Sequence, residues 1–160
     1  MYSHLGDNRP VFEWFKRKRK PAPPLLPPPP PHHDDVLGML EWNAEDDAWV
    51  ATVRLAPQPF RILVGGDDRP DERLLAHARD IYTAPGKLAG QVNELLRKEA
   101  HDLPDWTDEI RGLHLADIAL LWPDDPEGGI VYLDGPEPGE RRWQCDLKDR
   151  QATGPLSYDD

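Results

Sequence analysis

Residues 113–147 decide the fold, and their sequence is LHLADIALLWPDDPEGGIVYLDGPEPGERRWQCDL. Three runs in it are rich in strand-forming residues, and they cover 113–122, 130–134 and 141–147. Two segments of turn-forming residues, 124–129 and 135–139, separate them. We therefore predict a three-stranded antiparallel meander. A sheet with one apolar face is stable only against another layer, so the helical patterns upstream should cover it.

Upstream of the meander, strand patterns occupy 37–42, 48–55 and 60–64, and apolar residues recur at helical spacing over 74–82 and 88–96. The second helix should end before Pro104. Trp42 and Trp49 flank a polar turn and are placed to pair across two strands. The prediction is an α+β domain over 36–160, with antiparallel sheet(s) in βββ-αα-βββ order covered by two helices. Residues 156–158 would add a short edge piece.

The first 35 residues differ in composition from the rest. Eight of the eleven residues in 21–31 are proline, which favours an extended polyproline II spacer. We therefore divide the chain into a disordered basic aromatic tail (1–20), a proline-rich linker (21–35) and the folded domain (36–160). His32, His33, Asp34 and Asp35 end the linker; they are metal-ligand types, but a flexible strand gives them no fixed geometry.

Five consecutive cations follow an aromatic cluster in the tail. Such a segment can bind an anionic membrane surface, because the aromatic rings enter the interface and the cations meet lipid phosphates. A nuclear localisation signal, a nucleic-acid arm and a plain solvated tail are the alternatives. The membrane-surface candidates are Trp14, Phe15, Lys16, Arg17, Lys18, Arg19 and Lys20.

The folded domain is acidic. The whole chain has a formal net charge of -11, and residues 36–160 hold 13 Lys/Arg against 26 Asp/Glu, or -13. An acidic domain repels phosphate backbones, so we expect no nucleic acid to bind it. If charge selects a partner, the partner is a basic protein; the alternative is that the acidic surface serves solubility alone.

Cys145 is the only cysteine, which excludes an intrachain disulfide and a cysteine-based zinc cage. Cys145 lies two positions from both Trp143 and Leu147, so the three side chains share one face of the predicted strand. This placement predicts a buried, inert thiol. No run of about 18 apolar residues exists and the N-terminus lacks signal-peptide features. We expect a cytoplasmic protein without a cofactor, and peripheral association with the membrane is the alternative.

Two acidic clusters are the candidate contact sites for a basic partner. The first follows Gly65 and Gly66 at the start of a helix, where four carboxylates are incompatible with a phosphate-binding loop and would cap the helix. A divalent ion bound there would make a carboxylate-metal hydrolase the third functional alternative. The candidates are Asp67, Asp68, Asp71, Glu72, Asp124, Asp125 and Glu127.

We assign no catalytic residue and no metal site. His77 and His101 lack a second ligand nearby and are expected on the surface. His114 and Asp117 are an odd number of positions apart, so strand parity places them on opposite faces and excludes a direct acid–base dyad. Arg142 and Asp146 are expected to form a surface ion pair.

The order of elements from Trp49 through both helices to Leu113-His114-Leu115-Ala116-Asp117-Ile118 and Trp143-Gln144-Cys145-Asp146 resembles an uncharacterised bacterial domain of small soluble proteins. Relatives of that domain occur in toxin-immunity gene neighbourhoods. The resemblance covers about residues 36–160 and implies no catalytic residues. The sequence thus predicts a non-enzymatic acidic interaction domain that binds a basic protein, with toxin immunity as one form of that activity. A membrane-surface adaptor is the first alternative.

Overall fold

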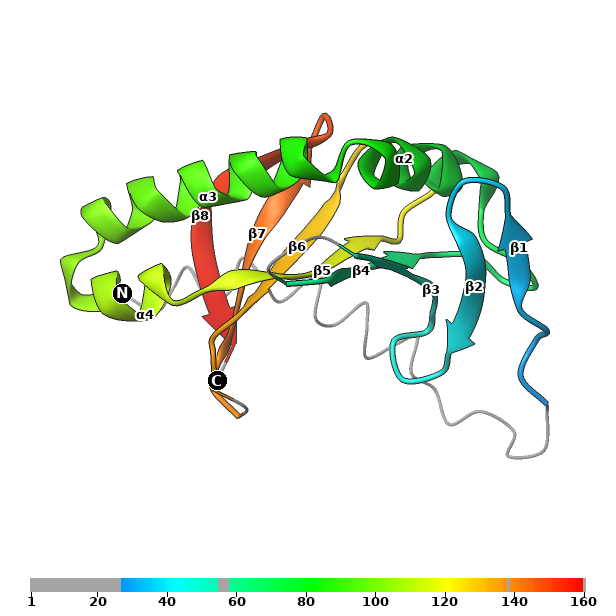
Figure 1. Ribbon diagram of the computed structural model, residues 1–160, viewed down its shortest axis with the longest axis horizontal. Coiled ribbons are helices and arrows are strands. Elements are labelled where there is room, and N and C mark those ends of the chain that lie inside the picture. Colours follow the sequence, from blue (N-terminus) through cyan, green and yellow to red (C-terminus); the bar gives the residue numbers. More distant parts are fainter. Residues whose placement is uncertain (1–26, 55–57, 138, 160) are drawn as a thin grey trace.

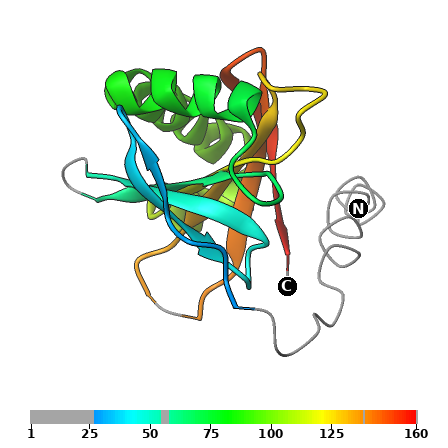
Figure 2. The same ribbon diagram turned by 90° about the vertical axis from the view of Figure 1, so that its right-hand side faces the viewer.

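The computed structural model describes residues 27–54, 58–137 and 139–159. The basic tail 1–20, with its membrane-surface candidates, and residues 21–26 of the linker lie outside the described residues. In the described part, three α-helices lie on one side of a strongly twisted sheet (Figures 1 and 2). The arrangement buries the apolar side of the sheet under the helices.

Eight strands form this sheet: β1 (His32–Asp34), β2 (Gly38–Asn43), β3 (Ala48–Val53), β4 (Phe60–Val64), β5 (His114–Leu120), β6 (Gly129–Asp134), β7 (Arg142–Lys148) and β8 (Gln151–Asp159). The helices are α2 (Glu72–Thr83), α3 (Pro85–Asp102), the 3-10 helix η2 (Pro104–Trp106) and α4 (Thr107–Arg111). All of these helices, the ones within the described residues, come between β4 and β5 in the sequence.

The strands lie in the sheet in their order along the chain, from β1 at one edge to β8 at the other. Every neighbouring pair is antiparallel except β4 and β5, which are parallel, with Ile62 opposite Ile118. Parallel neighbours need a long crossover, and the segment with α2, α3 and α4 supplies it. The crossover joins an N-terminal half of four strands to a C-terminal half of four strands in one sheet.

The chain is therefore α+β, but the predicted arrangement is wrong. The predicted order, βββ-αα-βββ with two covering helices and antiparallel pairing, had two strands too few and one helix too few. Residues 104–111, beyond the predicted end of the second helix, form η2 and α4. The helices also create the parallel β4–β5 junction, which no strand pattern predicts because pairing direction depends on where the crossover returns the chain.

The sheet begins at His32, four residues before the predicted start of the domain. β1 was missed because His32-His33-Asp34 is polar, short and preceded by prolines. Asp34 holds it in place: its side chain is buried, and it accepts hydrogen bonds from the backbone N–H groups of Val36 (3.0 Å) and Leu37 (2.9 Å). Arg79 of α2 also binds it, with Nη2–Oδ1 at 2.6 Å. Asp34 thus fastens the β1–β2 hairpin to a helix.

The C-terminal strand β8 was predicted only as a short edge piece at 156–158. Gly154 and Pro155 argue against a strand, but an edge strand tolerates proline because one side of it has no neighbouring strand. Helix α3 covers this free side. Gln91 Oε1 accepts from the N–H of Ala152 (3.1 Å), and buried Glu99 Oε1 accepts from the N–H of Leu156 (2.8 Å). Two side chains of α3 thereby block strand addition at this edge.

The larger core lies between the helices and the sheet. It includes Trp49, Ile62, Ile118, Leu133 and Trp143, which are at most 2 % exposed. The predicted pairing of Trp42 with Trp49 is confirmed, with ring centroids 5.7 Å apart. A second, smaller cluster occupies the opposite face of the sheet, and its members are Ala48, Leu63, Ala119, Leu121 and Ile130.

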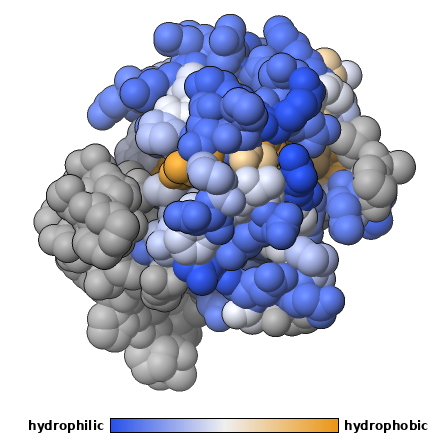
Figure 3. Space-filling view, turned by 90° about the vertical axis from the view of Figure 1, so that its left-hand side faces the viewer, coloured by the Kyte–Doolittle hydropathy of each residue, from blue (hydrophilic) through white to orange (hydrophobic). Residues whose placement is uncertain are grey.

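Figure 3 shows the end of the molecule where α3 ends and α4 follows. Most of the described surface there is hydrophilic, with a small hydrophobic area near the middle. A hollow of about 370 Å³ at this end has Leu96 and Leu113 among its lining residues, together with exposed His101, a surface histidine as predicted. None of the helices in the described ranges is long and apolar enough to cross a membrane.

We expect Asp34→Asn to destabilise the protein by about 2 kcal/mol at neutral pH. Hydrogen bonds from Arg79 and from the Leu37 and Val36 amides hold the pKa of Asp34 at about 2, below its ordinary value of 3.8. A lowered pKa stabilises the fold fully above about pH 4, and the contribution is lost as the pH falls towards 2. Urea unfolding of wild type and variant at several pH values would measure the gap.

The matched control is Asp35→Asn, because the neighbouring Asp35 carboxylate is fully exposed. We expect that substitution to change the free energy of unfolding by less than about 0.5 kcal/mol. A wild-type advantage over Asp34→Asn that stays constant between pH 5 and pH 2 would contradict the role given to the Asp34 carboxylate.

Candidate functional site

An acidic cavity lies where the two parallel strands end. Gly65 and Gly66 follow β4, and Leu121 and Pro123 follow β5; all four line a cavity of about 670 Å³. The N–H of Gly65 donates to the carbonyl of Leu120 (2.8 Å), which joins the two strand ends. Ligands of sheets with parallel strands bind outside the carboxyl ends of those strands, so the position is typical of a binding site.

The loop between β4 and α2 is fixed by its backbone. Gly66 pairs with Pro70 in an isolated bridge, and the N–H of Asp71 donates to the carbonyl of Gly65 (2.8 Å). Gly66 has φ 151°, and a side chain there would meet the Arg69 carbonyl oxygen at 2.2 Å. Only glycine fits this close approach. The closed loop therefore presents the exposed side chains of Asp67 and Asp68 from a defined backbone.

Negative charge dominates the cavity lining. Five carboxylates stand against one guanidinium, Arg69, and the imidazole of His32 completes the ionisable groups. With the imidazole neutral, the formal charge of the lining is five negative and one positive, or -4. The carboxylates belong to Asp47, Asp67, Asp68, Asp71 and Glu72.

The structure brings together the four acids of the first predicted cluster. Asp71 caps α2, with Oδ1 accepting from the N–H groups of Arg73 (2.9 Å) and Leu74 (3.3 Å), so the predicted capping role is confirmed. Glu72 accepts from Arg79 Nη1 (2.9 Å). Asp67 and Asp68 form no ion pair or hydrogen bond within the described residues and are free to meet a ligand.

The second predicted cluster does not enter the cavity. Asp124, Asp125 and Glu127 lie on the loop between β5 and β6, next to the lining residues Leu121 and Pro123. Glu127 Oε2 is bound by Arg150 Nε at 3.1 Å. Asp124 and Asp125 are exposed, in a turn that begins at Trp122.

The cavity does not form a metal centre. No group of three or more His, Cys, Asp or Glu side chains in the described ranges is arranged to hold a metal ion. The described residues therefore give the carboxylate-metal hydrolase no set of metal ligands.

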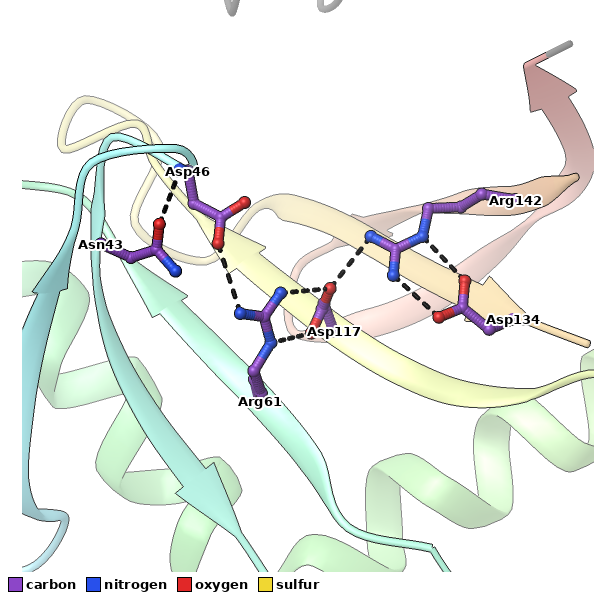
Figure 4. Close-up of polar contacts among 6 residues, drawn as sticks. All are labelled: Asn43, Asp46, Arg61, Asp117, Asp134 and Arg142. Carbon is purple, nitrogen blue, oxygen red and sulfur yellow. Dashed lines mark hydrogen bonds and ion pairs between the residues drawn. The ribbon is translucent and has the colours of Figure 1, made fainter. Parts of the chain in front are cut away.

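A charge network crosses the face of the sheet opposite the helices (Figure 4). Asp117 of β5 is 2 % exposed and binds two arginines. Arg61 of β4 donates to it from Nε (2.7 Å) and Nη2 (3.0 Å), and Arg142 of β7 donates from Nη1 (3.0 Å). Arg142 also binds Asp134 of β6 through two bonds of 2.8 Å, and Arg61 reaches Asp46 at 3.3 Å.

The network is almost neutral, because three carboxylates face two guanidiniums. The hydrogen bonds from Arg142 lower the pKa of Asp134, and the bond to Asp117 raises the pKa of Arg61. Both shifts favour the charged forms. The guanidinium of Arg142 lies 5.2 Å from the ring centre of Tyr132. With its polar groups paired with one another, the network acts as a structural clamp.

Two predictions about these residues are wrong. A β-bulge between Leu115 and Asp117 shifts the alternation of β5, so His114 and Asp117 share a face instead of lying on opposite faces. Asp117 nevertheless forms its hydrogen bonds with Arg61 and Arg142 and not with His114. Arg142 was expected to pair with Asp146 but binds Asp134 and Asp117, because the register of β6 and β7 brings Asp134 within its reach.

Cys145 and His77 are both buried, whereas the sequence predicted burial for Cys145 alone. Cys145 is buried as expected, and burial raises the pKa of its thiol to about 12, which leaves it protonated and unreactive. His77 was expected on the surface but is 1 % exposed. Positions 74, 78 and 81 form one apolar face of the helix, and position 77 lies on the same face. The helical spacing could therefore have predicted the burial of His77.

Comparison of the chain with protein-family models, curated proteins and solved structures finds no match. The resemblance drawn from the order of elements therefore stays a prediction.

We expect Asp117→Asn to lower the free energy of unfolding by about 3 kcal/mol, because it removes the buried charge that two arginines share. Asp46→Asn is the control at the edge of the network, where a pair with partly exposed groups is worth less than about 1 kcal/mol. Urea denaturation followed by far-UV circular dichroism would measure both. Equal losses for the two variants would contradict the central role of Asp117.

Proposed function

We propose that this protein is a non-enzymatic interaction domain whose acidic cavity binds a cationic segment of a basic protein partner. The observation that carries the proposal is the cavity itself: five carboxylates line about 670 Å³ at the carboxyl ends of the parallel strands. A lysine or arginine side chain of a partner has the charge and the size for such a space.

The acids contribute in two ways. Asp67 and Asp68 have no partner within the described residues, so they are the groups to contact the ligand's cation directly. Asp71 and Glu72 are engaged with the helix start and with Arg79, and they add negative potential without changing partners. Because the Gly66–Pro70 bridge closes the loop, Asp67 and Asp68 lose little backbone freedom on binding.

The net charge of residues 36–160 supports the same partner class. A charge of -13 attracts a cationic protein over distances of about a Debye length, which speeds encounter and makes association sensitive to salt. We place this activity in the cytoplasm. The predicted resemblance to domains from toxin-immunity gene neighbourhoods would make the basic partner a toxin, which this protein would neutralise.

The test is fluorescence anisotropy of a labelled octalysine peptide with the full chain. We expect the double variant Asp67→Asn/Asp68→Asn to weaken binding about fivefold to tenfold at low salt, as two partly screened ion pairs would. The control Asp124→Asn/Asp125→Asn removes the same charge from the adjacent loop outside the cavity, and we expect less than about a twofold change.

Binding should weaken steeply as salt rises from about 0.05 M to 0.5 M for wild type, since screening shortens the reach of the field. Equal losses for the two double variants would reduce the effect to unspecific attraction between net charges. Absence of octalysine binding by the wild-type chain at low salt would refute the proposal.

A further inference from the structure

A second cavity lies between α2, α3 and the β7–β8 turn, and it shares no lining residue with the acidic cavity. Its volume is about 230 Å³. Ile81, Leu88 and Leu147 form an apolar wall, and each is buried. A small apolar wall with a few convergent polar groups is the usual construction of a small-molecule site.

Buried His77 supplies the first of these polar groups. Its Nδ1 lies 2.8 Å from the carbonyl oxygen of Pro126. A carbonyl only accepts, so Nδ1 carries the proton and Nε2 is left as an acceptor. Burial lowers the pKa of His77 and keeps the ring neutral at pH 7. Nε2 has no hydrogen-bond partner within the described residues, although the ring lines the cavity.

The start of α3 supplies a positive end to the same cavity. This 18-residue helix has no side-chain cap at Ala84 and no acid in its first turn, in contrast to α2 with Asp71 and Glu72. The dipole of a helix favours an anion at its start. Pro85 has no N–H and the N–H of Lys87 donates to the carbonyl of Ala84 (3.2 Å), so the helix dipole and the Lys87 side chain carry this preference. Lys87 lies in this first turn and lines the cavity, and it forms no ion pair within the described residues.

The nearby carboxylates are already bound. Arg150 reaches across the turn to both Asp80 and Glu127, binding the latter at 3.1 Å. Of the charged groups that line the cavity, Lys87 and Arg150 are positive and Asp80 is negative, so the formal charge of the lining is two positive and one negative, or +1. A positive cavity in a domain of charge -13 indicates a ligand of the opposite sign from the one proposed for the acidic cavity.

We propose that this second cavity binds a small apolar carboxylate that also carries a hydroxyl group. The carboxylate would lie against Lys87 and the start of α3, and the apolar body against the wall. The hydroxyl would donate to Nε2 of His77, which has no hydrogen-bond partner within the described residues. A volume of about 230 Å³ limits the ligand to roughly ten heavy atoms, since drug-sized ligands occupy larger cavities.

The probes are 4-hydroxyphenylacetate, phenylacetate, which lacks the hydroxyl, and tyramine, in which an ammonium replaces the carboxylate. Each would be titrated into the full chain and followed by amide NMR shifts and by the nitrogen shifts of the His77 ring. We expect saturable binding of 4-hydroxyphenylacetate below about 10 mM, binding of phenylacetate about fivefold weaker, and none of tyramine. The shifts should concentrate in the first turn of α3 and at Nε2.

Two lysine variants of the same helix complete the test. Lys87→Gln should weaken 4-hydroxyphenylacetate binding about tenfold, whereas Lys98→Gln, on an exposed side chain that pairs with Asp102, should leave it unchanged. Because both positions are exposed, folding is preserved in either variant. Equal affinity of tyramine, equal effects of the two variants, or no saturable shift with 4-hydroxyphenylacetate would each overturn the proposal.

Discussion

The buried carboxylate of Asp117, in the middle of the sheet, is the constraint on which the face opposite the helices depends. Asp117 is removed from water, so its charge requires partners, and it finds Arg61 on one side and Arg142 on the other. Arg61 belongs to the N-terminal half of the sheet and Arg142 to the C-terminal half. The same charge therefore links the halves that the parallel β4–β5 junction joins through the backbone, and the helices cover only the other face.

The crossover that makes β4 and β5 parallel also creates both cavities. It places the start of α2 beside the ends of the two strands, where the acidic cavity forms. It then packs the start of α3 against the β7–β8 turn, where the second cavity forms. The two helix starts differ in charge, because α2 begins with Asp71 and Glu72 whereas α3 begins with Pro85 and Lys87. Loop residues add to each sign: Asp47, Asp67 and Asp68 in the acidic cavity, and Arg150 in the second cavity.

Much of the fold could be predicted where the residue pattern is local. The alternation in β3, β4 and β7 and the polar turn after Asn43 have their predicted places, because period and turn chemistry act within a few residues. The apolar face of α2 was also predicted from the helical spacing of its residues. β1 was missed and β8 was predicted only over 156–158, because their stability comes from distant partners: Arg79 for Asp34, and Gln91 and Glu99 for the N–H groups of β8.

The candidate site divides in the same way. The sequence determined that the first acidic cluster follows a glycine pair and caps a helix, and that the domain as a whole is strongly acidic, since these are properties of neighbouring residues and of composition. Only the tertiary structure decided that Asp67 and Asp68 have no partner within the described residues, whereas Arg150 binds Glu127. It alone placed His77 inside a cavity and Arg142 on Asp117 and Asp134. The physical reason is that a side chain's partner depends on strand order, register and bulges, and one bulged residue in β5 turned the predicted face of His114 over.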